Sequence, residues 1–322
     1  MNKISVYGSG VEHRKSLVTG GAGFIGSHLV DRLIQRGDEV TVIDNLRTGR
    51  KSFINPRANF VNLDIGDSDS LAKYFVGVND VYHLAANADV RNGWDDPLRD
   101  FEENLVKTLN IARLSAESSV ENLIFSSTGS IYGDASVFPT PENYSVDHQT
   151  SLYGASKYSC ESFLGAYAEA NKFKVTVLRF VSVLGPRYTH GHVYDFIKQL
   201  INDPTKLVVL GDGNQTKSYM HVSDCVDAIA TLRGSSDFEV FNVGQKDTLS
   251  VHRSIEVITG ILNATPELHF ASSDRGWIGD SPVILLDTQK ANSSGWQPKV
   301  VIEDALKDTV NWIIQNQWVY NK

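Results

Sequence analysis

Tyr153 and Lys157 are the residues whose types and spacing most clearly indicate chemistry. They stand four positions apart in "YGASK", at the start of a helix expected over residues 151–172. At this spacing two side chains share one face of a helix. A lysine ammonium close to a phenol favours the phenolate and lowers the pKa of the tyrosine. The pair therefore predicts a general base that removes a hydroxyl proton while hydride leaves the carbon for an oxidised nicotinamide.

A glycine-rich loop near the N-terminus predicts where that nicotinamide cofactor binds. Gly20, Gly23 and Gly26 stand between an expected strand over 16–19 and an expected helix over 24–37, which Gly37 ends. They allow a tight turn, close approach of the backbone to a pyrophosphate, and close helix–strand packing. The helix N-terminus offers free N–H groups to the phosphates. Asp44 ends the next expected strand, over 39–44, where it can accept hydrogen bonds from an adenosine ribose. A carboxylate would repel a 2′-phosphate, so NAD is favoured over NADP.

The surrounding elements predict the fold that positions these residues. Short β-branched segments over 59–64, 80–86, 121–127 and 174–183 alternate with amphipathic segments such as 97–119. This alternation predicts an α/β fold, a Rossmann-type doubly wound parallel sheet with helices on both faces. Residues 15–185 are expected to form the NAD-binding domain, after an extension over 1–14. Residues 186–322 are expected to form mainly a smaller, interleaved α/β substrate lobe, with some segments returning to the sheet.

Composition excludes several other classes. The net charge of −8 and the pI of about 5.6 argue against a nucleic-acid binder. No apolar run reaches the roughly 18 residues of a membrane span, and the N-terminus lacks the apolar core of a signal peptide. Cys160 and Cys225 form neither a metal-type nor a redox-type pair, so we expect a cytoplasmic protein with no metal site.

The combined motifs resemble the extended short-chain dehydrogenase/reductase family, most closely its UDP-glucose 4-epimerase-like branch of nucleotide-sugar epimerases. The resemblance covers about residues 15–318, through "TGGAGFIGS", "VIDNLRTG", "LDI", "HLAA", "FSSTGSIYG" and "YGASK". It implies bound NAD, a UDP-linked sugar as substrate, and a homodimer that packs helices 97–118 and 153–171. It also implies that Asn104 braces the active-site strand and that Thr128, Tyr153 and Lys157 are catalytic. The implied cofactor-binding residues are Gly20, Gly23, Phe24, Ile25, Gly26, Asp44, Asn45, Asp64, Ile65, Leu84, Ala85, Ala86, Asn104, Ser126, Tyr153, Lys157 and Phe180.

The residues after Thr128 indicate the reaction. In the resembling dehydratases and uronate decarboxylases, carboxylates follow the threonine, whereas Gly129 and Ser130 follow it here. The favoured reaction is therefore epimerisation through a transient 4-keto sugar, with Tyr153 as base and Thr128 bonded to the C4 oxygen. A 4-ketoreductase or dehydrogenase on the same scaffold is the alternative. A cofactor-sensing module without catalysis is disfavoured, because a sensor needs no base.

The expected substrate-binding residues depart from the family pattern. Ser182 stands at the usual asparagine, Lys217 at the usual pyrophosphate arginine, and Trp277 at a second arginine. Lysine keeps the charge but loses the bidentate fork. Arg275, two residues before Trp277, is expected to reach the diphosphate instead. Thr128, Arg187, His192 and Ile284 complete the expected contacts, with Ile284 at the position that gates the C2 substituent. Hexose, N-acetylhexosamine and uronic acid all stay open, and the departures suggest polysaccharide biosynthesis.

Overall fold

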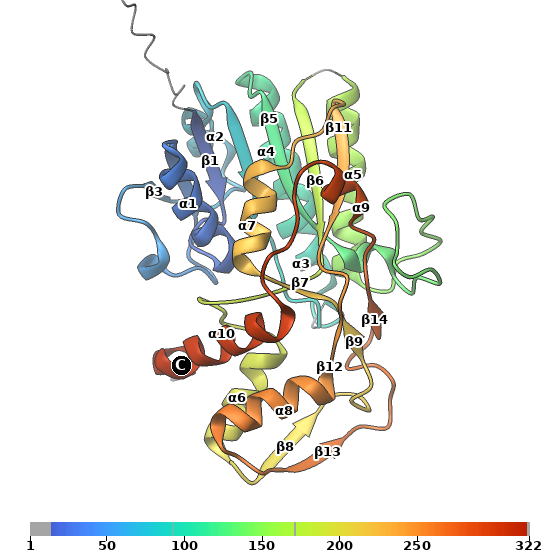
Figure 1. The fold of residues 1–322 in the computed structure, drawn as a ribbon. Helices are drawn as coiled ribbons and strands as arrows, with labels where there is room; N and C mark the ends of the chain where they lie inside the picture. The colour runs from blue at the N-terminus through green and yellow to red at the C-terminus, as the bar shows by residue number, and fades with distance from the viewer. Residues whose placement is uncertain (1–13, 92, 171, 321–322) are drawn as a thin grey trace, which may run out of the picture.

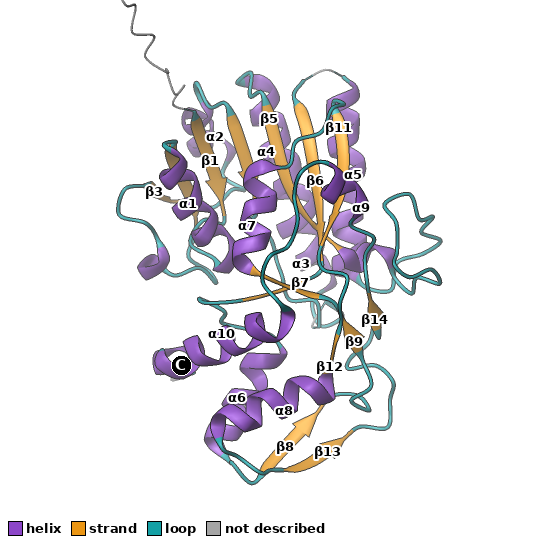
Figure 2. Cartoon of the chain, viewed as in Figure 1, coloured by secondary structure: helices purple, strands orange, loops and turns teal. Residues whose placement is uncertain are grey.

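The computed structural model describes residues 14–91, 93–170 and 172–320. A seven-stranded parallel sheet is its largest element, with the strand order β11-β6-β5-β4-β1-β2-β3 (Figures 1 and 2). The strands are β1 (Lys15–Thr19), β2 (Glu39–Asp44), β3 (Asn59–Asn62), β4 (Asp80–His83), β5 (Asn122–Thr128), β6 (Lys174–Phe180) and β11 (Phe238–Val243). The predicted Rossmann-type α/β class is confirmed. Strand order reverses between β1 and β4, and in such sheets ligands bind at the carboxyl ends near that point.

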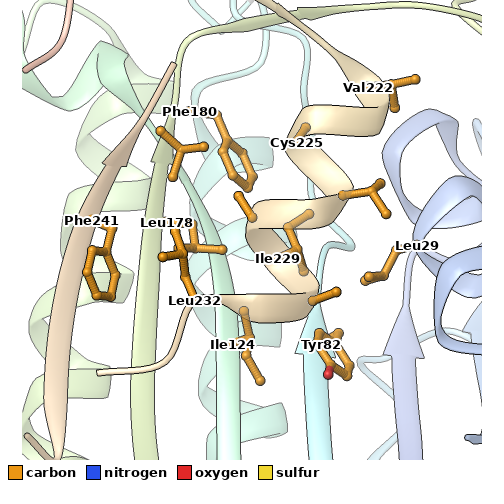
Figure 3. Close-up of a cluster of buried hydrophobic side chains, with 14 of the residues drawn as sticks. Leu29, Tyr82, Ile124, Leu178, Phe180, Val222, Cys225, Ile229, Leu232 and Phe241 are labelled. Carbon is orange, nitrogen blue, oxygen red and sulfur yellow. The ribbon is translucent and has the colours of Figure 1, made fainter. Parts of the chain in front are cut away.

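Helices cover both faces of the sheet (Figure 1). The helices are α1 (Phe24–Arg36) and α7 (Val222–Thr231) on one face, with α2 (Ser68–Leu71), α4 (Lys107–Glu117) and α5 (Leu152–Glu169) on the other. Figure 3 shows α7 with Cys225 and Ile229 directed at the apolar side chains of the sheet and α1. Each face of a parallel sheet must be covered in this way because both faces carry apolar residues.

The first helix ends where its glycine predicts. Gly37 adopts a left-handed conformation with φ of 104°, and its N–H donates to the Ile34 carbonyl. The N–H of Asp38 donates to the Leu33 carbonyl. These two bonds close the helix in the manner of a Schellman motif, for which glycine is the favoured residue.

The helix predicted over 97–119 contains a π-helical turn. It consists of α3 (Pro97–Asp100), a π-helical turn (Phe101–Val106) and α4. A π-helical turn interrupts the i, i+4 pattern of side chains and is frequent at functional sites. Here it carries Asn104, which is buried.

The smaller lobe lies beyond the carboxyl ends of the sheet strands (Figure 1). Its main elements are α6 (His192–Asn202), β8 (Lys206–Val209), α8 (Val251–Leu262), β13 (Glu267–Phe270) and α10 (Ile302–Gln315), around a separate apolar core. Short strands join the lobes: β7 (Ser182–Leu184) with β10 (Tyr219–His221), and β9 (Thr216–Lys217) with β12 (Leu249–Ser250) and β14 (Val283–Ile284). The remaining elements are α9 (Gln289–Ser293) and 3-10 turns at Lys51–Phe53, Ala72–Phe75, Gly129–Tyr132 and Gln317–Val319.

The chain passes between the lobes more than once, since both α7 and β11 follow residue 186, yet α7 packs on the large sheet and β11 is one of its strands. The domain boundary at 185/186 stays a prediction. Within the described ranges, none of the helices combines the length and apolar character needed to cross a membrane.

Candidate active site

The glycine loop brings backbone from three elements into close contact. Gly20 has φ of +72°, and a Cβ atom there would lie 2.7 Å from the Ala85 nitrogen. A Cβ at Gly26 would overlap the Gly20 carbonyl oxygen. The Gly23 N–H donates to that same oxygen at 3.1 Å. A side chain at Gly20 or Gly26 would therefore force these backbone segments apart and disrupt the turn that holds a pyrophosphate next to the N-terminus of α1.

Asp44 holds its carboxylate at the end of β2, beside this loop. One oxygen accepts from the Ala22 N–H at 2.9 Å and the other from the Leu46 N–H at 2.8 Å. Burial raises the pKa of Asp44, and the two backbone hydrogen bonds act in the opposite direction. The carboxylate is thus fixed in one orientation, with lone pairs left for a ribose diol. These residues fit the adenosine and pyrophosphate parts of NAD.

Asn45 and Asp64 meet at the rim of the same region. The Asn45 amide donates to Asp64 at 2.8 Å, and Lys107 forms ion pairs with Asp64 and Glu103, each at 2.8 Å. Burial raises the pKa of Asp64, but the hydrogen bonds from Lys107 and from the Gly66 backbone outweigh it, so the net pKa lies below its usual value. Asp64 therefore serves this region as an anion that orients Asn45.

The three predicted catalytic side chains converge at the end of β5. Helix α5 begins after Ser151, whose hydroxyl accepts from the Gly154 N–H at 3.0 Å. This start aims Tyr153 at Thr128, with which it shares a side-chain hydrogen bond. Lys157 is 2% exposed, and its ammonium donates to the Ser126 carbonyl at 2.9 Å. The two hydroxyls and the ammonium are therefore held on neighbouring backbone segments.

Tyr153 titrates in the opposite direction to the one that the sequence predicted. Burial raises the pKa of its phenol, the charge of Asp100 raises it further, and the Thr128 hydrogen bond lowers it only in part. The Lys157 ammonium is directed at the Ser126 carbonyl. Burial also lowers the pKa of Lys157 to about 8. The spacing of four residues predicted that Tyr153 and Lys157 lie close together. It could not predict how strongly burial disfavours the charged forms of both side chains.

Asn104 connects a loop to the catalytic helix. Its side-chain oxygen accepts from the Asn87 N–H at 2.7 Å, and its amide donates to the Ser156 hydroxyl at 2.9 Å. The Ser156 hydroxyl donates to the Tyr153 carbonyl at 2.8 Å. The expectation that Asn104 braces the active-site strand is thus corrected, because the π-helical turn directs its side chain to the loop after β4 and to α5.

Asp100 is a buried residue that the sequence reasoning missed. It is 1% exposed and accepts from the Asn87 amide at 2.8 Å and from the Asn104 amide at 3.3 Å. The i, i+4 spacing from Asn104 was the available signal. Its carboxylate adds a negative charge close to Tyr153 and Lys157.

A cavity of about 1200 Å³ runs from the glycine loop to the smaller lobe. The predicted residues that line it are Gly20, Phe24, Ile25, Asp44, Asn45, Ile65, Ala85, Ala86, Thr128, Tyr153, Phe180, Ser182, His192, Lys217, Trp277 and Ile284. The predicted residues that do not line it are Gly23, Gly26, Asp64, Leu84, Asn104, Ser126, Lys157, Arg187 and Arg275. Lys157 bonds to the carbonyl of Ser126, which directly precedes the lining residues Ser127 and Thr128.

At the substrate end, Lys217 has an acidic partner. Its ammonium lies 2.5 Å from the Asp280 carboxylate, which is 3% exposed, and 4.8 Å from the centre of the Trp277 ring. Ile284 is the register partner of Lys217 between β14 and β9. His192 lies nearby in the lining; burial and the charge of Lys217 lower its pKa to about 4, so its ring is neutral near pH 7.

Two predicted arginines lie elsewhere. Arg275 pairs with Asp134 at 2.8 Å and donates to the Asp280 carbonyl at 2.7 Å. Arg187 pairs with Asp31 of α1 at 2.9 Å. At the family's second arginine position, Trp277 lines the cavity, and Arg275, which was expected to reach the diphosphate, does not. The carboxylates that pair with these arginines are more than a hundred residues away in the sequence. Local motif spacing could therefore not predict these ion pairs.

Comparisons with known proteins agree with this geometry. The family model described as "NAD dependent epimerase/dehydratase family" matches residues 16–244. UDP-glucose 4-epimerase of Mycolicibacterium smegmatis is 33% identical, over 92% of this chain and 98% of the relative. UDP-glucuronic acid decarboxylase 1 of Xenopus tropicalis is 31% identical, over 94% of this chain and 72% of the relative. The crystal structure of UDP-glucose 4-epimerase from Thermotoga maritima with UDP-glucose is 36% identical, with a TM-score of 0.86, over 94% of this chain and 99% of that one.

The fold and the site together define an enzyme of the Rossmann type that binds a dinucleotide at the switch between β1 and β4. The chain belongs to the NAD dependent epimerase/dehydratase family. The predicted cofactor, NAD, and the predicted class, a nucleotide-sugar epimerase, are confirmed by the family and by the epimerase matches.

Proposed function

We propose that this protein is a UDP-hexose 4-epimerase that works through a transient 4-keto sugar. The observation that carries the proposal is the side-chain set around Thr128. Its hydroxyl contacts Tyr153 and donates to the Ser130 hydroxyl at 3.1 Å, where a dehydratase or decarboxylase of the resembling type has a carboxylate. Elimination and decarboxylation need an added acid or base at this point, whereas oxidation followed by re-reduction of C4 does not.

Each catalytic side chain has one task in this reaction. The Tyr153 phenolate takes the proton of the C4 hydroxyl, and Thr128 donates a hydrogen bond to the C4 oxygen as it becomes a ketone. We assign to the Lys157 ammonium the task of favouring the phenolate electrostatically, against the burial that raises the pKa of the phenol. NAD, when bound along the glycine loop and Asp44, supplies the acceptor for the C4 hydride and a positive ring that also favours the phenolate.

In the second half of the reaction, the 4-keto sugar must rotate within the cavity. Tyr153 then returns the proton to the oxygen after hydride reaches the opposite face of C4. The cavity volume of about 1200 Å³ leaves room for this motion beside a bound dinucleotide. Ser182 and Ile284 both line the cavity. Ile284 is intermediate in size between the tyrosine and the small residue that the resembling family has at this position, so hexose, N-acetylhexosamine and uronic acid all stay open.

A panel of UDP-linked sugars tests the proposal. The purified protein, without added nicotinamide, should convert UDP-glucose, its N-acetyl analogue or its uronic analogue into the C4 epimer, identified by NMR. Turnover that depends on added NAD or NADH, and that yields a 4-keto or 4-reduced product, would instead identify the oxidoreductase alternative.

Substitution of the base provides the matched test of mechanism. Tyr153→Phe removes only the phenolic oxygen, so NAD should stay bound while the turnover number falls by about 10²- to 10⁴-fold, the usual contribution of a general base. Thr128→Val should lower turnover less, because it removes the hydrogen bond to the C4 oxygen but leaves the base in place. Full activity of the Tyr153→Phe protein would exclude the proposed base.

We also propose a homodimer, formed by the helices on one face of the large lobe. What supports it is a set of exposed apolar side chains on the helical segment 97–117 and on α5, namely Leu98, Phe101, Val106, Tyr158 and Phe163. Exposed apolar groups of this extent commonly mark interfaces. Phe163→Asp should yield a monomer in light scattering, and an unchanged mass would exclude this face. The cytoplasmic location and the role in polysaccharide biosynthesis stay predictions.

A further inference from the structure

The ion pair between Arg91 and Asp195 joins the two lobes beside the cavity. The Arg91 guanidinium lies 2.8 Å from the Asp195 carboxylate. Arg91 belongs to the loop after β4 in the large lobe, and Asp195 to the first turn of α6 in the smaller lobe. Both residues line the cavity. We call this contact the inter-lobe ion pair.

The Arg91 side of this contact is anchored to the catalytic helix. Asn87 begins the segment, and its side chain and backbone are held by Asp100 and Asn104 through the bonds described above. Asn104 in turn bonds to Ser156 of α5. The Arg91 N–H donates to Asp89 at 3.2 Å. The segment 87–91 is therefore fixed at its start to α5 and at its end to α6.

The Asp195 side adds an ordered wall. The His190 ring stacks on Tyr188, with centroids 5.9 Å apart and an interplanar angle of 6°, and both residues line the cavity. Burial and the charge of Arg91 lower the pKa of His190, whereas Asp195 and Asp89 raise it in part. The ring is thus neutral near pH 7 and does not compete with Arg91 for Asp195.

The proposed reaction creates a need for such a contact. The 4-keto sugar must rotate between the two hydride transfers, so it cannot keep all its hydrogen bonds to the protein. Its nucleotide and the cavity walls must therefore retain it. The cation expected at the diphosphate already has an acidic partner here, because Lys217 pairs with Asp280, and Trp277 lines the cavity where the resembling family has an arginine.

We propose that the inter-lobe ion pair keeps the lobes together over the 4-keto intermediate and so prevents its release before re-reduction. Arg91 and Asp195 are positioning residues in this account, which rests on the proposed epimerase function. When the intermediate is released, the hydride taken from C4 stays on the nicotinamide and the hydroxyl proton stays on Tyr153. The products of each release are therefore one free ketone and one protein with reduced cofactor, in equal amounts.

The test measures those two products in the holoenzyme. Arg91→Gln and Asp195→Asn should each raise the amount of ketone per turnover by about fivefold, the size expected for a partly exposed ion pair. The ketone is trapped as an oxime and counted by mass spectrometry, and the reduced nicotinamide is read by its near-ultraviolet absorbance. The exchanged pair, Arg91→Asp with Asp195→Arg, should return both readings toward the wild-type level.

Arg32→Gln serves as the matched control. Its ion pair with Asp227 has side-chain exposures of 39% and 29%, close to the 37% and 32% of Arg91 and Asp195, and neither residue lines the cavity. It should leave both readings unchanged. Single variants that release no more ketone than this control, or that only raise KM, would overturn the proposal while the epimerase function stands. A wild-type protein that epimerises no nucleotide sugar would overturn both.

Discussion

The two ends of the cavity are built in different ways. At the cofactor end, contacts come from backbone atoms and from a carboxylate held by backbone amides, as at Gly20 and Asp44. At the substrate end, they come from long side chains that neutralise one another, as Lys217 and Asp280 do. Backbone geometry permits few substitutions, whereas an ion pair can be exchanged for another arrangement. The cofactor end therefore keeps its family pattern, and the substrate end is where this chain departs from it.

The largest effect is expected at the cofactor end, for Gly20→Val. A side chain there would meet the Ala85 backbone, so the variant should lose bound NAD and all activity. Gly77→Val is the matched control, because Gly77 has the same φ of +72° but open space around its Cβ position. The control bears the conformational cost alone, about 1–3 kcal/mol, and should keep NAD. Cofactor content by absorbance, with unfolding in denaturant, measures both. If both variants lose NAD, the cause is the positive φ at the substituted position and not the contact with the Ala85 backbone.

A smaller effect is expected for Lys217→Met at the substrate end. Removing the ammonium should raise KM by about tenfold or more, the size of one charge-assisted hydrogen bond, with little change in turnover number. Lys217→Met also leaves the buried Asp280 carboxylate without its ion-pair partner, which could destabilise the protein. The double variant Lys217→Met with Asp280→Asn removes that charge as well, so it separates an effect on substrate binding from an effect on protein stability. Lys217→Arg should stay near wild type in KM. If the wild-type protein and all of these variants have the same KM, Lys217 does not contact the substrate.

Trp277→Arg should lower KM severalfold, since it places a second cation where the lining now has an aromatic ring. Trp277→Phe is the control that keeps an aromatic ring and adds no charge. Steady-state kinetics on the best substrate of the panel measures the difference. A higher KM for Trp277→Arg than for Trp277→Phe would mean that the indole itself contacts substrate.

The smallest effect is the pH dependence of Lys157. Because burial lowers its pKa to about 8, the ammonium that favours the Tyr153 phenolate is lost as pH rises through about 8, and kcat/KM should decline there. Stability behaves differently: a lysine with a lowered folded-state pKa binds fewer protons when folded, so its contribution to the free energy of unfolding rises between about 8 and its ordinary value. A declining rate with an unchanged fold, checked by circular dichroism, fits this account. A rate profile that stays flat well above pH 8 contradicts it.

Local physics explains which features could be predicted from sequence. Gly20, Gly26 and Asp44 could be placed because their roles follow from a strand, a turn and a helix that are adjacent in sequence. Arg275 was misplaced because its partner, Asp134, approaches only in the folded chain. The π-helical turn at Asn104 was missed because the hydrophobic period of 97–119 fits a continuous α-helix. The raised pKa of Tyr153 depends on burial and on the charge of Asp100. The four-residue spacing from Tyr153 to Lys157 gives no information about either.

The central claim is that hydride leaves C4 and returns to C4 within one protein molecule. UDP-glucose carrying deuterium at C4, incubated with the purified protein in ordinary water and without added nicotinamide, tests it directly. The account predicts a C4 epimer that keeps its deuterium at C4, as read by NMR and mass spectrometry. Loss of the label to solvent, or its transfer to free nicotinamide, would contradict the account.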